Sequence, residues 1–177
     1  MSKVKIHDKT FEISIHHDKI LERVKAIAEQ MNKDLKDKDV IFLGILNGSF
    51  MFASDLFKYI TVPAPISFLK LASYEGTFSS GKVKRLIGIN EDIADKTVII
   101  IEDIVDSGLT LEQIIKQLRG YDPADIKVAT LLYKPEAYTK DIDIDYVGFS
   151  IPPDFIIGYG LDYDGLGRNL PHIYKVE

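Results

Sequence analysis

The chain has 177 residues, of which 46% are hydrophobic, and its formal net charge at pH 7 is −5. This length predicts one domain, residues 1–177, with a sizeable core, and the acidic balance argues against nucleic acid as a partner, since such binding relies on clustered lysine and arginine. The absence of cysteine excludes disulfides and thiolate sites and favours a cytoplasmic location, and no apolar run approaches the roughly 20 residues that cross a membrane.

The N-terminal part of the chain predicts extended structure followed by a helix. Apolar residues between Ile6 and Ile15 favour strands. A helix is expected next, with Asp18 as its candidate N-cap. The apolar residues that recur at helical spacing are Ile20, Val24, Ile27 and Met31.

The next segment predicts a strand, a polar turn and a helix. Val40–Leu46 is a short apolar run that ends at Asn47-Gly48-Ser49, and residues Phe50–Tyr59 read as a helix. After Pro63 and Pro65, a strand is expected at Ile66–Leu71. Ser73–Lys84 (SYEGTFSSGKVK) is rich in glycine and serine and predicts a long mobile loop.

Two further buried strands are predicted at Thr97–Ile101 and Ile126–Leu132, the first of them followed by a helix whose apolar face is Leu111, Ile114, Ile115 and Leu118. Repeated units of strand, turn and helix or crossover indicate an α/β fold with a parallel sheet. Ligands of such sheets bind beyond the carboxyl ends of the strands, so function is expected in the loops after Leu46, Ile101 and Leu132.

The segment Thr97–Leu111 (TVIIIEDIVDSGLTL) carries most of the chemical information. Gly108 permits a close turn, Ser107 and Thr110 offer hydroxyls, and the amides of a starting helix attract anions, which together suit a phosphate monoester. The carboxylates of Glu102 and Asp103 suit sugar hydroxyls or a divalent cation. The alternative is an acidic helix cap after solvated residues at a strand end.

VIIIEDIVDSGLTL resembles the phosphoribosyl diphosphate signature of type I phosphoribosyltransferases. The segments ILNGSFMFASDL, LASYEGTFSSG, Lys134-Pro135 and DFIIGYGLDYDGLGRNLP are similar to the hypoxanthine-guanine branch of that family. The resemblance implies a parallel sheet core flanked by helices, with a small hood from the N- and C-terminal segments. It also implies purine salvage, in which phosphoribosyl diphosphate and hypoxanthine or guanine give IMP or GMP and pyrophosphate, with Mg²⁺ as the cofactor and a homodimer or homotetramer as the assembly.

The same resemblance assigns roles to individual residues. Asp106 is the expected general base or acid at purine N7. Glu102, Asp103, Ser107, Gly108, Leu109 and Thr110 would bind the phosphoribosyl group; Asn47, Gly48 and Arg168 the pyrophosphate; and Lys134, Phe155, Ile156 and Asp162 the purine. Glu102, Asp103 and Asp162 would bind the metal, and Ser73 and Tyr74 would be the first residues of a lid that closes over the ribose.

Several of these assignments have a structural alternative. Asp106 could be only a helix cap, Lys134 and Arg168 surface charges, Phe155 part of the core and Asp162 a turn residue. Three rival functions also stand: a phosphoribosyltransferase with another purine preference such as xanthine, an RNA-binding regulator of the same fold, and a nucleotide-binding module without catalysis.

Asn47 departs from the family pattern, which often has Lys-Gly at this point, joined by a cis peptide. The change removes a positive charge, so pyrophosphate would depend more on the backbone of Gly48 and Ser49, on Arg168 and on magnesium. If a cis peptide is kept, the resemblance puts it between Asn47 and Gly48.

Overall fold

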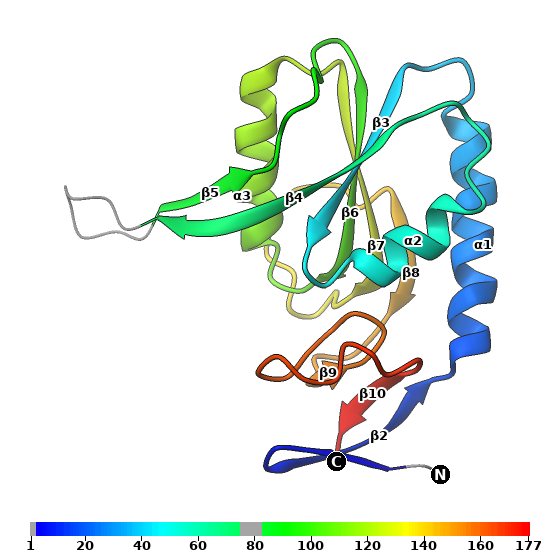
Figure 1. The fold of residues 1–177 in the computed structure, drawn as a ribbon, viewed down its shortest axis with the longest axis vertical. Coiled ribbons are helices and arrows are strands. Elements are labelled where there is room, and N and C mark those ends of the chain that lie inside the picture. The colour runs from blue at the N-terminus through cyan, green and yellow to red at the C-terminus, as the bar shows by residue number, and fades with distance from the viewer. Residues whose placement is uncertain (1–2, 75–82) are drawn as a thin grey trace.

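The main sheet has the strand order β5-β4-β3-β6-β7-β8 in the computed structural model, which describes residues 3–74 and 83–177 (Figure 1). Five neighbouring strands run parallel, and β5 is antiparallel to β4 at the edge. This arrangement confirms the predicted α/β fold. The strands are β3 (Val40–Leu46), β4 (Ile66–Tyr74), β5 (Val83–Ile87), β6 (Thr97–Val105), β7 (Asp125–Tyr133) and β8 (Tyr146–Ser150).

Helices cover both faces of this sheet. Helices α1 (His17–Asp34) and α2 (Phe50–Phe57) pack on one face, whereas α3 (Leu109–Leu118), which continues into the 3₁₀ turn Arg119–Tyr121, packs on the other. Successive strand residues alternate between the two cores, as a pleated strand requires. The predicted apolar faces of α1 and α3 are all buried, which confirms both helical patterns. No helix within the described residues is long and apolar enough to span a bilayer.

The start of α1 differs from the prediction. Its first residue is His17 and its N-cap is His16, so Asp18 lies inside the first turn and caps nothing. The amide of His17 instead donates to Nδ1 of His172, at 2.9 Å. Because this acceptor comes from the other end of the chain, the cap leaves no local trace in the sequence.

A second, antiparallel sheet forms the predicted hood. Its strand order is β1-β2-β10-β9, so the N-terminal strands pair with the C-terminal ones. Figure 1 shows this sheet beyond the end toward which β3 points, with both chain ends there. The hood strands are β1 (Val4–Ile6), β2 (Lys9–Ile15), β9 (Ile156–Ile157) and β10 (Ile173–Val176).

Both ends of the segment Ser73–Lys84, expected as a loop, lie in strands. Ser73 and Tyr74 are the last residues of β4 and pair with Lys84 and Val83 of β5. They are in a strand because the antiparallel ladder with β5 continues as far as Tyr74 and supplies their backbone with partners. The remaining loop residues, 75–82, lie outside the described residues.

Candidate active site

Three loops lie side by side at the carboxyl ends of the parallel strands. Strands β3, β6 and β7 are adjacent and parallel, so their carboxyl ends lie side by side. The segments that follow them contain Asn47–Ser49, Asp106–Gly108 and Lys134–Lys140. The three loops in which function is expected therefore lie close together.

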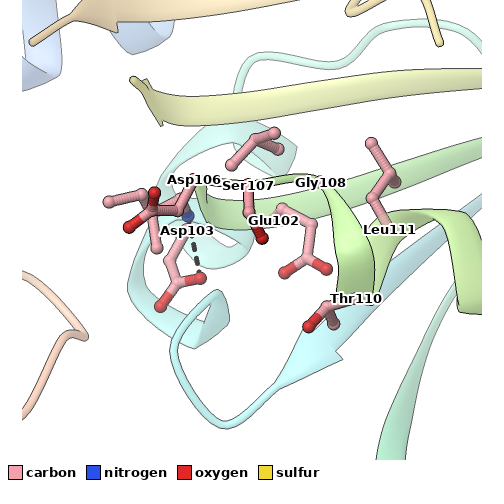
Figure 2. Close-up of a pocket in the computed structure, with 9 residues that line it drawn as sticks. Glu102, Asp103, Asp106, Ser107, Gly108, Thr110 and Leu111 are labelled. Atoms are coloured by element: carbon pink, nitrogen blue, oxygen red, sulfur yellow. Dashed lines mark hydrogen bonds between the residues drawn. The ribbon is translucent and has the colours of Figure 1, made fainter. Parts of the chain in front are cut away.

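The turn between β6 and α3 forms a pocket of about 260 Å³. Gly108, with a φ of +82°, is the N-cap of α3 and allows the chain to turn directly into the helix. Its carbonyl accepts a bond of 2.9 Å from the amide of Glu112, which closes the first helical turn. The pocket is lined by Glu102, Asp103, Ile104, Val105, Asp106, Ser107, Gly108, Thr110 and Leu111 (Figure 2).

Leu109 differs from the other residues expected at this turn. Its side chain is 55% exposed, and it is not among the residues that line the pocket. Its amide lies 3.4 Å from Oγ of Ser107, which is at the long end for a hydrogen bond. The expected part of Leu109 in binding therefore stays a prediction.

The loop after β7, Lys134–Lys140, packs against this turn, and this contact was not foreseen. The carbonyl of Ser107 accepts bonds from the amide and the Oγ1 of Thr139, at 3.2 and 3.1 Å. A Cβ on Gly108 would lie 2.5 Å from the ring of Tyr138, so only glycine fits there. These contacts join residues about thirty positions apart, and no short-range pattern in the sequence reports them.

The two acidic residues of the signature lie within β6. The sequence had suggested that they follow the strand. Glu102 is 6% exposed, and burial, followed by the charge of Asp103, raises its pKa well above the ordinary range. Burial also raises the pKa of Asp103 to about 6. Its Oδ1 accepts a 2.8 Å bond from the amide of Ile104, drawn as the dashed line in Figure 2. Buried carboxylates of this kind favour a ligand that brings positive charge or hydroxyl donors.

Gly48 brings the loop after β3 into contact with these acids. A Cβ at Gly48 would lie 1.5 Å from Oδ2 of Asp103, so no side chain fits there. Asn47 is exposed. A cis peptide is present, but it joins Leu46 to Asn47 at the end of β3 and not Asn47 to Gly48, so its expected position was wrong by one bond.

Arg168 and Asp162 form the hood side of the site. A guanidinium nitrogen of Arg168 lies 2.7 Å from Oδ1 of Asp162, and Nη1 donates to the carbonyl of Gly160 at 2.6 Å. Burial is the largest influence on the pKa of Asp103. The positive charge of Arg168 lowers this pKa, and the negative charge of Asp162 raises it. The hood therefore contributes charge to the same region as Gly48 and β6.

Lys134 and Asp106 are paired across two neighbouring loops. The ammonium of Lys134 lies 3.0 Å from Oδ2 of Asp106. The lysine side chain is 10% exposed and the aspartate side chain 53%. Lys134 is thus a buried cation at the sheet edge and not a surface charge, and half of the Asp106 side chain stays open to a ligand.

Phe155 and Ile156 occupy different environments. Phe155 is 43% exposed and packs edge-on to Tyr163 with ring centroids 5.4 Å apart, whereas Ile156 is buried in β9. Neither lines the pocket at the turn between β6 and α3. The exposed face of Phe155 leaves a surface on which a flat ring can stack.

Within residues 3–74 and 83–177, no three His, Asp or Glu side chains are grouped so that they alone could hold a metal ion. Glu102, Asp103 and Asp162 nevertheless supply oxygen atoms of the kind that magnesium prefers. A cation here would need further ligands from a bound molecule or from water.

Comparisons with known proteins agree with this geometry. The model of the phosphoribosyl transferase domain family matches residues 14–164. A hypoxanthine phosphoribosyltransferase from Buchnera aphidicola subsp. Schizaphis graminum is 40% identical over 170 residues, which cover 94% of this chain and 96% of that protein. A hypoxanthine-guanine phosphoribosyltransferase from Streptococcus pneumoniae is 39% identical over 163 residues, which cover 92% and 91% of the two chains.

Solved structures resemble the chain equally closely. A hypoxanthine phosphoribosyltransferase from Staphylococcus aureus matches with a TM-score of 0.85 at 38% identity and covers 94% of this chain and 91% of its own. For a hypoxanthine-guanine phosphoribosyltransferase from Bacillus anthracis, the TM-score is 0.86 at 37% identity, with coverage of 94% and 98%.

Proposed function

The chain belongs to the phosphoribosyltransferase family, and we propose that it transfers the 5-phosphoribosyl group of phosphoribosyl diphosphate to hypoxanthine or guanine. The products are IMP or GMP and pyrophosphate, so the enzyme serves purine salvage. One observation carries the proposal: the pocket at the turn after β6 lies beside the paired side chains of Lys134 and Asp106.

The sugar phosphate binds at the turn between β6 and α3. Ser107, Gly108 and Thr110 line that pocket, and the first amides of α3 together with the helix dipole favour an anion there. The carboxylates of Glu102 and Asp103 face the same pocket and accept hydrogen bonds from the ribose hydroxyls.

The purine binds with its 6-oxo and N7 edge toward Lys134 and Asp106. These two purine positions are neighbours on one edge of the base, and the separation of 3.0 Å between ammonium and carboxylate matches that adjacency. Lys134 donates a hydrogen bond to the 6-oxo oxygen. Adenine has an amino group at this position, which is itself a donor, so adenine is rejected. Phe155 stacks on the base, and the backbone of Ile156 reads its exocyclic edge.

The reaction forms the bond between purine N9 and ribose C1′ and breaks the bond between C1′ and the pyrophosphate oxygen. The purine loses a proton from N7 as N9 attacks, and the Asp106 carboxylate takes up that proton. Arg168 holds the departing pyrophosphate together with the backbone of Gly48, because a guanidinium suits that anion. The neutral Asn47 adds no charge to this loop.

Magnesium fits the donor set of the site. Asp103 and Asp162 would hold it, with Glu102 nearby, and the remaining ligands would be oxygens of the substrate and water. The ion would neutralise negative charge on the leaving pyrophosphate. Buried carboxylates with raised pKa values, such as Glu102 and Asp103, are stabilised in the ionised form by such a cation.

Ser73 and Tyr74, at the end of β4, lead into the proposed lid over the ribose. Ribosyl transfer builds positive charge on the sugar, and a closed lid keeps water from capturing it.

We further propose a cytoplasmic enzyme that assembles as a homodimer or homotetramer. The lack of cysteine supports the location, and the exposed aromatic rings of Phe50 and Phe68 support contact with a second copy.

The test is an assay of the purified protein with phosphoribosyl diphosphate, magnesium and one base at a time. Ultraviolet absorbance follows nucleotide formation, and a coupled assay follows pyrophosphate. We expect turnover with hypoxanthine and guanine and none with adenine. Nucleotide binding without release of pyrophosphate would overturn the proposal, and a clear preference for xanthine would correct its substrate.

A further inference from the structure

Tyr159 has an unusual backbone conformation for a large side chain. Its φ is +46° and that of Gly160 is +102°, so both central residues of the turn Gly158–Leu161 are left-handed. The amides and carbonyls of Gly158 and Leu161 exchange hydrogen bonds of 3.0 Å across the turn. Such turns favour glycine, asparagine and aspartate, so a tyrosine here requires an explanation.

The side chain of Tyr159 ties this turn to helix α2. The ring is 1% exposed and packs in the core cluster that contains residues of α1 and α2. Its hydroxyl donates to Oδ2 of Asp55 in α2, at 2.5 Å, and Oδ1 of Asp55 accepts from Lys58 at 2.7 Å. Burial and the Asp55 carboxylate raise the pKa of Tyr159, so its hydroxyl keeps the proton that it donates.

The turn itself touches the residues assigned to pyrophosphate. A Cβ on Gly160 would lie 2.2 Å from the carbonyl oxygen of Gly48, so the two segments are in close backbone contact. The carbonyl of Gly160 accepts a 2.6 Å bond from Nη1 of Arg168, and its amide donates to the carbonyl of Arg168 at 3.0 Å. Helix α2, which carries Asp55, begins two residues after Gly48.

We propose that the hydrogen bond between Tyr159 and Asp55 positions the pyrophosphate subsite. It holds the turn at Gly160 in the conformation that sets both the guanidinium of Arg168 and the loop at Gly48. Neither Tyr159 nor Asp55 is a catalytic residue, because each acts through other groups. The inference rests on the proposed function, since it concerns the leaving group of that reaction.

The test removes the hydroxyl and keeps the ring. In Tyr159→Phe, we expect KM for phosphoribosyl diphosphate and Kd for magnesium pyrophosphate, measured by calorimetry, to rise about five- to ten-fold, as loss of one buried hydrogen bond predicts. Turnover number and IMP affinity should stay within about two-fold, because IMP carries no pyrophosphate. Asp55→Asn keeps an acceptor for the hydroxyl and should give a smaller rise in the same two constants.

The matched control is Tyr146→Phe. Tyr146 is also buried and its hydroxyl bonds to an aspartate, Asp34, at 3.2 Å, but its strand, β8, follows β7 at the far edge of the sheet from β3. This variant should lower the melting temperature without changing the pyrophosphate constants. If Tyr159→Phe does not fold, Asp55→Ala removes the same hydrogen bond from the helix side and replaces it in the test.

The outcomes separate the inference from the function on which it rests. A wild-type protein that releases no pyrophosphate overturns the proposed function. An active wild type with unchanged pyrophosphate constants in Tyr159→Phe overturns only the positioning role, and so does a variant that weakens IMP and pyrophosphate equally. A double variant, Tyr159→Phe with Asp55→Asn, should be no weaker for pyrophosphate than Tyr159→Phe alone.

Discussion

The ammonium of Lys134 lies 3.0 Å from Oδ2 of Asp106, which links the end of β7 to the start of the phosphate turn. The two residues are 28 positions apart in the chain, and parallel pairing of β6 with β7 brings them together. One charge pair therefore connects the residue proposed to recognise the base with the residue proposed to take up its proton. The first two predictions separate these roles.

Asp106→Asn should mainly lower turnover. The amide cannot accept the N7 proton, and loss of a general base reduces rates by roughly 10²- to 10⁴-fold. The affinity for IMP should stay comparatively intact, since the turn at Gly108 is unchanged. Steady-state kinetics with hypoxanthine and calorimetry with IMP measure the two effects. The reverse pattern, with weak nucleotide binding and near-normal turnover, would assign Asp106 to binding.

Lys134→Gln should weaken selection of the base. The neutral amide loses a charge-assisted bond to the 6-oxo oxygen, so kcat/KM for hypoxanthine should fall roughly 10- to 100-fold. Discrimination against adenine should narrow, because an amide can also present an oxygen to a 6-amino group. The control is Lys127→Gln, which removes an ion-paired lysine within β7, 3.0 Å from Asp145. Unchanged selectivity in Lys134→Gln would remove Lys134 from base recognition.

Gly48→Ala should damage both the fold and the pyrophosphate loop. Its Cβ would lie 1.5 Å from Oδ2 of Asp103, so either the loop or the carboxylate must move. Overpacking of this kind costs about 1–3 kcal/mol of unfolding free energy, and KM for phosphoribosyl diphosphate should rise with it. Gly120→Ala is the control, since a Cβ there meets nothing within 4 Å. Normal kinetics in Gly48→Ala would show that the loop tolerates a side chain.

Asp103→Asn should stabilise the free protein in a pH-dependent manner. Burial raises the pKa of Asp103 to about 6, whereas an aspartate in the unfolded chain titrates at about 4. Below about pH 4 the carboxyl group of Asp103 is protonated in both the folded and the unfolded state and has no effect on stability. Between about pH 4 and 6 the unfolded chain ionises more readily than the folded state, so the free energy of unfolding of the wild type falls over this range. The Asn variant has no carboxyl group here and shows no such fall.

The expected advantage of Asp103→Asn is on the order of 1–3 kcal/mol above pH 6.5 and vanishes near pH 4. Urea unfolding without magnesium or nucleotide measures it. The same variant should lose activity, because the neutral amide no longer serves the ribose or the cation. A stability difference that does not vary with pH would mean that burial of this charge is not the cause.

The local features of this protein follow directly from its sequence. Apolar runs such as Thr97–Ile101 and the spacing of Leu111, Ile114, Ile115 and Leu118 depend on neighbours within a few positions, so their strands and helices were predicted correctly. The turn between β6 and α3 was predicted for the same reason, because its glycine, its hydroxyls and the helix start are contiguous. That it binds a phosphate stays a prediction. The resemblance to phosphoribosyltransferases uses the same short segments, and it identified the family.

The errors lie where a distant segment supplies the partner. Asp18 was a reasonable N-cap by its position. The acceptor at the start of α1 is instead Nδ1 of His172, which binds the amide of His17, 155 residues away. Ser73, expected to begin a loop, lies in β4 because β5 pairs with the end of that strand. Glu102 and Asp103 lie within β6 since pairing with β7 continues to Val105.

The sequence by itself thus determined the core strands β3, β6 and β7, the helices α1 and α3, and where the turn between β6 and α3 lies. Only the tertiary structure decided which side chains meet. The Tyr159–Asp55 bond spans 104 residues, and Thr139 reaches Ser107 across 32. The raised pKa values of Glu102 and Asp103 arise from burial by several segments together. Propensity and periodicity act over a few residues, whereas these contacts and this desolvation exist only after the chain has packed.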